Sequence, residues 1–227
     1  MKSIKMILIA LVIPMTSSWA GPLQEKLDAR KNSGKRPEEI KKIMEDSLRD
    51  LKDSGIEKKA VSKNMSLPKF MVGPKSISDV YKDGPVVVKF FRGSWCPYCI
   101  IELKEYKNLA AEFEKANCKL IVLSPDTEKE NLKTQNKLGL PFKLYSDKDN
   151  MIAKKFGIAF KVQDDLNAVY KKFGIDLDSN QGTSKHEIPM PGTYVANKKG
   201  KITYAFIDAD YTKRAEPLEV LKECKNN

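Results

Sequence analysis

The chain has 227 residues, with 41 lysines and arginines against 30 acidic residues and a formal net charge of +11 at pH 7. A basic balance can indicate a nucleic-acid or membrane-surface partner. Here the lysines are scattered among acids along expected helical faces, as in Glu102, Lys104, Glu105 and Lys107, and no basic block is interleaved with stacking aromatic residues. The charge therefore indicates a lysine-rich solvated surface, and we expect no nucleic-acid partner.

Residues 1–20 have the pattern of a secretory signal peptide. A short basic start at 1–5 is followed by an apolar run over 6–15, and small residues stand at Ser18 and Ala20. Ten or so apolar residues are too few to cross a bilayer, which needs about twenty, and no later segment is long and apolar enough to span one. We therefore expect cleavage after Ala20 and a protein exported to the periplasm with no stable membrane insertion.

Residues 21–65 form a predicted N-terminal helical extension. The segment is polar, but apolar residues recur at helical spacing from Leu23 onward. Pro37 in a first turn, with Glu38 and Glu39 beside its positive end, predicts the start of a helix. One or two surface helices would pack on the following domain or on a second subunit, so the sequence leaves a homodimer open.

Residues 66–227 form the predicted globular domain, and about 160 residues are ample for one core. Hydrophobic runs predict strands, and helical periodicity with capping residues predicts helices between them. The expected strands are 86–91, 119–124, 142–145, 193–196 and 201–207, and the expected helices are 100–113, 127–138, 147–156, 164–173 and one starting at Glu216. Strands alternating with helices, then a hairpin and a helix, predict a three-layer α/β domain with a central mixed sheet and helices on both faces.

The first buried strand runs into a Gly-Ser turn, Trp95, and two cysteines with C-x-x-C spacing, Cys96 and Cys99. This spacing places Cys96 at the first turn of the next helix, where Pro97 is favoured because its missing N–H would have no helical acceptor. The unpaired amides of a helix start favour negative charge, so they should stabilise the thiolate of Cys96. Cys96 should be open to solvent, and Cys99, one turn further in, should be less exposed and within reach for a disulfide. The pattern predicts a redox site supported by Trp95 and Pro97.

The same C-x-x-C spacing occurs in zinc sites, which need two further nitrogen or sulfur ligands. The chain has one histidine, His186, and its other cysteines, Cys118 and Cys224, are isolated in sequence. We therefore expect no metal and no other cofactor, and we interpret His186 as a solvated loop residue.

Several longer segments form a set of motifs around the C-x-x-C pair. They are residues 84–88, 91–99, 123–126, 146–147, 189–194 and 205–217. Together they resemble the peroxiredoxin-like branch of the AhpC/TSA (alkyl hydroperoxide reductase and thiol-specific antioxidant) family of the thioredoxin-like superfamily, and the similarity covers about residues 25–224. The resemblance implies a thioredoxin-like three-layer sandwich with an N-terminal helical extension.

The resemblance also implies a thiol-specific peroxidase that reduces hydrogen peroxide and organic hydroperoxides. Cys96 would be the peroxide-attacking cysteine, and its thiolate would become a sulfenic acid that a second thiol converts to a disulfide. Cys99 is the candidate resolving thiol, with Cys224 as a distant alternative. A thioredoxin-like reductant would then reduce the disulfide.

Two positions depart from the family pattern. Typical peroxiredoxins carry Pro seven residues and Thr or Ser three residues before the attacking cysteine, where this chain has Lys89 and Gly93. Ser94 is a candidate substitute for the missing hydroxyl. The activating arginine has two candidates, Arg92 nearby in sequence and Arg214 within a matching motif, and each could equally be an ordinary surface cation.

In thioredoxin-like folds a cis-proline loop lies against the C-x-x-C pair and offers backbone groups to an incoming thiol or disulfide. Pro191, followed by Gly192 and Thr193, is the candidate in this chain. A cis bond is rare for X-Pro in general, but the fold context favours it here.

The same fold places the helix that ends before Cys118 and the C-terminal helix that carries Cys224 on one face of the sheet. In an oxidising compartment an even number of cysteines is usually paired. We therefore predict a structural Cys118–Cys224 disulfide.

A second function class stays open. The Trp-Cys-Pro-Tyr-Cys stretch by itself favours a periplasmic thiol–disulfide oxidoreductase that acts on protein disulfides, whereas the rest of the chain favours the peroxidase. A redox-inert binding module is disfavoured, because Trp95 and Pro97 flank a thiol at a helix start.

Overall fold

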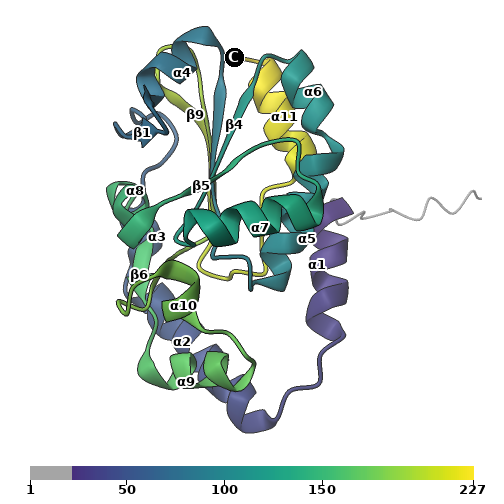
Figure 1. The fold of residues 1–227 in the computed structure, drawn as a ribbon, viewed down its shortest axis with the longest axis vertical. Coiled ribbons are helices and arrows are strands. Elements are labelled where there is room, and N and C mark those ends of the chain that lie inside the picture. The colour runs from purple at the N-terminus through teal and green to yellow at the C-terminus, as the bar shows by residue number, and fades with distance from the viewer. Residues whose placement is uncertain (1–21) are drawn as a thin grey trace, which may run out of the picture.

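The computed structural model describes residues 22–227, so the predicted signal peptide over 1–20 lies outside the described residues. A five-stranded sheet forms the centre of the domain (Figure 1). β3 (Val86–Phe90) runs parallel to β4 (Lys119–Ser124), and β4 runs parallel to β5 (Leu144–Ser146). β8 (Gly192–Ala196) is antiparallel to both β3 and β9 (Ile202–Ile207). Helices cover both faces, which confirms the predicted three-layer arrangement with a mixed sheet. The order of the strands across the sheet is β5, β4, β3, β8 and β9.

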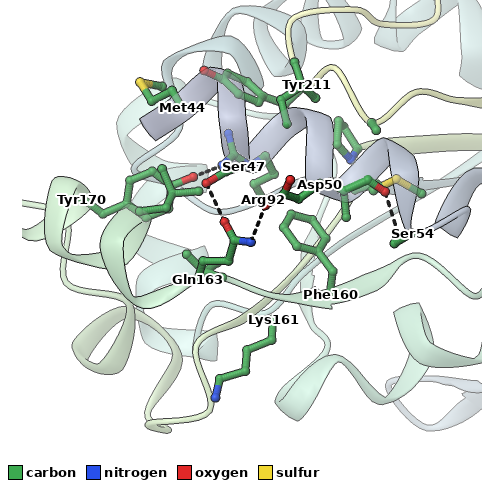
Figure 2. Close-up of a pocket in the computed structure, with 17 residues that line it drawn as sticks. Met44, Ser47, Asp50, Ser54, Arg92, Phe160, Lys161, Gln163, Tyr170 and Tyr211 are labelled. Carbon is green, nitrogen blue, oxygen red and sulfur yellow. Dashed lines mark hydrogen bonds between the residues drawn. The ribbon is translucent and has the colours of Figure 1, made fainter. Parts of the chain in front are cut away.

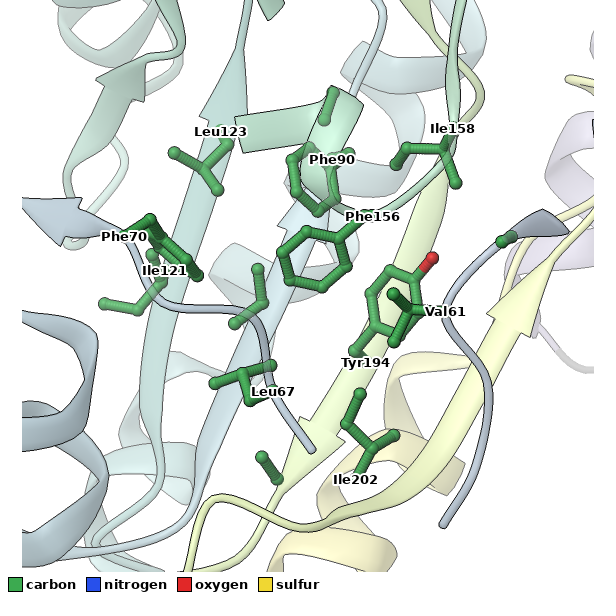
Figure 3. Packing of buried hydrophobic residues seen from close by; sticks show 14 of the residues in the cluster. Val61, Leu67, Phe70, Phe90, Ile121, Leu123, Phe156, Ile158, Tyr194 and Ile202 are labelled. Atoms are coloured by element: carbon green, nitrogen blue, oxygen red, sulfur yellow. The ribbon is translucent and has the colours of Figure 1, made fainter. Parts of the chain in front are cut away.

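Strand β3 is buried along its whole length, and its side chains alternate between the two faces of the sheet. Val88 and Phe90 enter the core on one face, and Val87 enters the core on the other. Figure 3 shows the first of these cores, where Phe156 packs between Phe90 and Tyr194 with ring centroids 4.8 Å from each. The helices that contribute to this core are α3 (Ile56–Lys59), α4 (Ile77–Asp83) and α8 (Met151–Lys155).

The opposite face of the sheet is covered by α5 (Pro97–Asn108), α6 (Ala110–Lys115) and α11 (Pro217–Lys225), of which α6 and α11 lie side by side in Figure 1. Cys118 and Cys224 form a disulfide here, with Cα atoms 6.0 Å apart, so the predicted pairing is present. Both cysteines are buried in the cluster that contains Phe113. Because this bond holds Cys224, Cys99 is the second cysteine available to Cys96.

The first helix of the N-terminal extension, α1 (Pro22–Asn32), packs along α5. Leu23 and Leu27 are buried against the C-x-x-C helix. The carboxylate of Glu216 accepts the backbone N–H groups of Leu23 and Gln24, at 3.2 and 2.8 Å, and so satisfies the open amides at the start of α1. The first turn of α1 is therefore hydrogen-bonded to the domain through Glu216.

The second helix, α2 (Glu38–Asp53), packs against α9 (Asp164–Lys172). A helix starts here as predicted, but Pro37 is its N-cap residue and not part of its first turn. Gln163 links the two helices, because its side chain accepts from Ser47 at 2.9 Å and donates to Asp50 at 3.0 Å. Helices α1 and α2 thus lie on the domain near the start of α5, and the third helix of the extension, α3, packs into the core described above.

Several expected elements have different limits. The helix expected over 100–113 is divided at Leu109 into α5 and α6, the strand expected at 142–145 is β5, and a 3-10 turn at 148–150 precedes α8. Helix α7 (Glu128–Leu138) follows Thr127, whose hydroxyl accepts the N–H of Glu130 and so caps the helix. The remaining short elements have too few residues for a periodic pattern: β1 (Met71–Val72), β2 (Lys75–Ser76), β6 (Ala159–Lys161), β7 (Glu187–Pro189) and α10 (Leu177–Gln181).

The prediction of a cis bond before Pro191 is wrong, because no peptide bond within residues 22–227 is cis. The Met190 N–H donates to the carbonyl of Ile158 at 2.8 Å, and β8 begins at Gly192. The chain therefore passes in an extended path from β7 into β8, and the lower-energy trans bond suits that path.

No helix in this described part of the chain combines the length and the apolar character that a membrane span needs.

Candidate active site

The turn between β3 and α5 holds the C-x-x-C pair in place. Gly93 in this turn has a φ of +145°, and a Cβ atom there would lie 2.4 Å from Trp95 Nε1 and 2.9 Å from Asp126 Oδ1. Glycine is required because the indole and the carboxylate close around the backbone. The Ser94 N–H donates to Asp126 Oδ2 at 2.7 Å. Ser94 therefore anchors the turn to the loop that follows β4.

Cys96 is the N-cap residue of α5, and Pro97 is the first residue of that helix, as the motif predicted. The Cys96 sulfur accepts hydrogen bonds from the thiol and the N–H of Cys99. Both cysteines are free but buried, with 1% and 0% of their surface exposed. The expectation of a solvent-open Cys96 is therefore wrong. Leu27 of α1 and Tyr211 pack in the same cluster as Cys96. Both residues are far from the C-x-x-C motif in sequence, so the motif alone could not indicate that they surround the thiol.

The electrostatic surroundings favour the thiolate of Cys96. Burial alone would raise the pKa of Cys96, but the hydrogen bond from the Cys99 thiol and the charges of Arg92 and Arg214 outweigh burial and lower it to about 6. Burial and the adjacent Cys96 raise the pKa of Cys99 well above its ordinary value. The pair therefore holds one ionised sulfur and one protonated sulfur at neutral pH.

Arg92 is a buried cation, with 4% of its surface exposed. Its guanidinium carbon lies 4.3 Å from the ring centroid of Tyr211 and 4.9 Å from that of Trp95. The guanidinium also donates a hydrogen bond to the Tyr170 hydroxyl. These aromatic contacts hold the positive charge in a fixed position near Cys96.

Arg214 is also buried, and it approaches the second sulfur, with Nη2 3.6 Å from Cys99 Sγ. Its Nε donates to Glu102 Oε2 at 2.8 Å, and Lys89 forms an ion pair with the other oxygen of Glu102. Lys89 Nζ also lies 3.5 Å from Thr193 Oγ1. A chain of buried polar groups thus runs from β8 through β3 and α5 to the dithiol.

Sequence reasoning missed Glu102, although two signals could have found it. Lys89 interrupts a buried apolar strand, and a buried lysine needs an anionic partner. Glu102 lies on the buried face of α5 together with Leu103 and Tyr106, at helical spacing from Cys99.

The two residues expected in a proline loop beside the cysteines have different surroundings. Pro191 lines a cavity together with Arg92, and Thr193 contacts Lys89. Thr193 is therefore connected to the dithiol through the buried ion pairs of Lys89, Glu102 and Arg214, and Pro191 is a neighbour of Arg92.

Cys96 lines a cavity of about 450 Å³. Arg92, Tyr170 and Tyr211 line this cavity and also an adjoining one of about 240 Å³. Figure 2 shows the second cavity, with Arg92 lying between Tyr170 and Tyr211. A small molecule in the larger cavity would therefore lie beside Cys96.

Among residues 22–227, no three His, Cys, Asp or Glu side chains gather in a way that could hold a metal ion. His186 is half-buried, and its Nε2 lies 2.8 Å from Asp178 Oδ1. It is thus engaged with α10 and is not the solvated residue that the sequence suggested.

The lowered pKa of Cys96 predicts a pH dependence of its alkylation. In the reduced protein, the rate of reaction with iodoacetamide should increase with pH through a midpoint of about 6 and then level off, because the thiolate is the nucleophile. Liquid chromatography with mass spectrometry at a series of pH values measures the rate at Cys96. In the unfolded protein the midpoint should return towards the ordinary value of 9.0. A midpoint near that value in the folded protein would contradict the prediction.

Comparison with known proteins gives a consistent result. The family model described as the AhpC/TSA family matches residues 56–205. The chain is 26% identical over 206 residues to the chloroplastic peroxiredoxin Q of Triticum aestivum, covering 87% of this chain and 85% of that protein. It is 28% identical over 150 residues to the chloroplastic peroxiredoxin Q of Oryza sativa subsp. japonica, covering 64% of this chain and 59% of that protein. The chain therefore spans about three fifths of the length of this rice relative.

Solved structures show the same fold. Peroxidoxin BcpB from Mycobacterium tuberculosis superposes with a TM-score of 0.56 at 18% identity, over 73% of this chain and 97% of that one. The Xylella fastidiosa PrxQ C47S mutant superposes with a TM-score of 0.52 at 20% identity, over 74% of this chain and 94% of that one. These similarities confirm the thioredoxin-like fold expected from the motifs.

Proposed function

Because the chain belongs to the AhpC/TSA family, we propose that it is a thiol peroxidase that reduces hydrogen peroxide and organic hydroperoxides at Cys96. The observation that carries the proposal is the position of Cys96. Cys96 sits at the start of α5 and lines a cavity, and the pKa of its thiol is lowered to about 6 by Cys99, Arg92 and Arg214 against the effect of burial.

The chemistry follows from this arrangement. The Cys96 thiolate attacks the terminal oxygen of the hydroperoxide, an S–O bond forms, the O–O bond breaks, and the departing alkoxide takes a proton to leave as an alcohol or, from hydrogen peroxide, as water. Sulfur is oxidised by two electrons and the peroxide is reduced by two. The Cys99 thiol then displaces water from the sulfenic acid and forms the Cys96–Cys99 disulfide. A thioredoxin-like dithiol protein would reduce that disulfide by exchange, and this step requires that a sulfur of the oxidised pair become exposed, since both sulfurs are buried in the reduced protein.

The structure favours small substrates over protein disulfides. A thiol–disulfide oxidoreductase must bring its sulfur against a sulfur of another folded protein, which requires an exposed attacking thiol. Cys96 and Cys99 are 1% and 0% exposed. The oxidoreductase therefore remains the second candidate function, supported by the Trp-Cys-Pro-Tyr-Cys motif alone.

One assay separates the two functions. Reduced protein, freed of added thiol, should consume one hydrogen peroxide per chain and lose two hydrogen atoms in mass as the Cys96–Cys99 disulfide forms. With a thioredoxin system it should then turn over peroxide continuously. Failure to consume peroxide, together with rapid reduction of insulin disulfides, would overturn the peroxidase and favour the oxidoreductase.

We also propose that the protein works outside the cytoplasm, after removal of residues 1–20. The Cys118–Cys224 disulfide supports this, since such bonds persist in oxidising compartments. Mass spectrometry of the protein from the periplasmic fraction should find a chain that begins at Gly21.

A further inference from the structure

The N-terminal extension adds positive charge to the cavity that contains Cys96. Arg30, Lys35 and Arg36, from the end of α1 and the segment after it, line this cavity. The first two are exposed and Arg36 is half-buried. Within residues 22–227, none of the three is in an ion pair, and no acidic side chain of this part of the chain lines the cavity. The charge at this side of the cavity is therefore uncompensated.

Apart from the buried Arg92, the remaining wall is apolar and largely aromatic. Trp95, Tyr170 and Tyr211 lie near Cys96, and Phe173 lines the cavity although 53% of its surface is exposed. A volume of about 450 Å³ lies within the range of sites that bind small organic ligands, roughly 300–1,000 Å³. An exposed aromatic ring beside unpaired cations suits a ligand that has both an apolar body and a negative charge.

We propose that the cavity selects organic hydroperoxides that carry a carboxylate on an aromatic or branched apolar body. This inference rests on the proposed peroxidase function and names its preferred substrate class. The carboxylate would pair with Arg30, Lys35 and Arg36, the apolar body would lie against the aromatic wall, and the hydroperoxide group would reach Cys96. The S–O bond then forms as the O–O bond breaks, and the product is the corresponding alcohol, with its carboxylate unchanged.

The inference also assigns a role to a part of the chain that precedes the family match. That match begins at residue 56, whereas the three cations lie between residues 30 and 36. Glu216 hydrogen-bonds to the start of α1, and α2 contacts α9. These contacts place the segment between α1 and α2, residues 33–37, at the cavity. Selectivity for an anion would thus come from the extension, and the chemistry from the domain.

A matched set of substrates tests the inference. Cumene hydroperoxide, its para-carboxylate and the methyl ester of that carboxylate share one reacting group and one aromatic body. The wild-type protein should use the carboxylate with a kcat/KM roughly tenfold above that of the ester, the lower end of the effect of a charged cleft on association. The ratio should decrease as salt is added, because exposed charges are screened. In the variant Arg30→Gln/Lys35→Gln/Arg36→Gln the ratio should fall close to one.

A control variant, Lys198→Gln/Lys199→Gln/Lys222→Gln, makes the same change in net charge with residues that do not line this cavity. It should keep the carboxylate preference of the wild type. Equal use of carboxylate and ester by the wild type, or the same preference in the first variant, would overturn the inference and leave the peroxidase intact.

A binding measurement separates this inference from the proposed function. The unreactive analogue 4-isopropylbenzoate should bind to the cavity of the wild type and change the fluorescence of Trp95, and its methyl ester should bind at least several-fold more weakly. If no peroxide is consumed, the proposed peroxidase function is refuted. The binding measurement then decides by itself whether the anion site exists. Equal binding of acid and ester would refute the anion site.

Discussion

Replacing Cys96 with serine is expected to lower the rate of peroxide turnover by roughly 10⁴-fold or more, the scale of loss seen when a catalytic nucleophile is removed. A serine hydroxyl stays protonated at neutral pH, so no anion would remain to attack the O–O bond. Serine is also a favoured N-cap residue, so α5 should keep its start and the variant should stay folded. The rate is measured as peroxide consumption with a thioredoxin system, and circular dichroism checks the fold. Retention of most of the activity would exclude Cys96 as the nucleophile.

The other cysteines give matched controls for this result. In Cys99→Ser the sulfenic acid on Cys96 should persist and react with dimedone, because no neighbouring thiol can displace it. The double variant Cys118→Ser/Cys224→Ser should keep one peroxide consumed per chain and an internal disulfide, since that pair lies in a separate cluster. Loss of disulfide formation in the double variant, with Cys99 present, would instead identify Cys224 as the resolving thiol.

Replacing Glu102 with glutamine is expected to lower the free energy of unfolding by roughly 3–5 kcal/mol, the usual effect of removing one partner from a buried ion pair. Glu102 is 0% exposed and pairs with both Lys89 and Arg214, so the substitution leaves two buried cations without their counter-charge. Burial already lowers the pKa of Lys89 despite the attraction of Glu102. In the variant, the unfolded chain would bind a proton that the folded chain has released, so the loss should be larger at acidic than at alkaline pH. Urea denaturation at one acidic and one alkaline pH measures the loss in the free energy of unfolding.

Two variants test whether burial is the cause. Glu105→Gln removes a carboxylate of the same helix that pairs with Lys26 at the surface, and such pairs are worth at most about 1 kcal/mol. The double variant Lys89→Met/Glu102→Gln should recover part of the loss, because one of the two unpaired cations is gone. An effect of Glu102→Gln no larger than that of Glu105→Gln would contradict the buried network.

Local features of the sequence were sufficient to predict the strand, the turn and the helix start at the centre of the fold. A buried apolar strand interrupted only by Lys89, a turn that only glycine can form and a proline in the first helical turn predicted where Cys96 lies and which helix it starts. The alternation of strands and helices predicted the three layers, and the fold implied by the motifs brought Cys118 and Cys224 together. The prediction of a cis Pro191 failed because it rested on the superfamily alone, with no local feature of this chain to support it.

The sequence by itself determined the strand, the helix start and the dithiol, because these depend on neighbours within a few positions and on periods of two and 3.6 residues. Only the tertiary structure decided what surrounds the dithiol. Arg92 meets Tyr170 across 78 positions, and Glu102 meets Arg214 across 112. Such contacts leave no periodic trace, because each depends on how separate elements pack. The same holds for α1, whose packing on α5 buries Cys96 and brings three cations to its cavity.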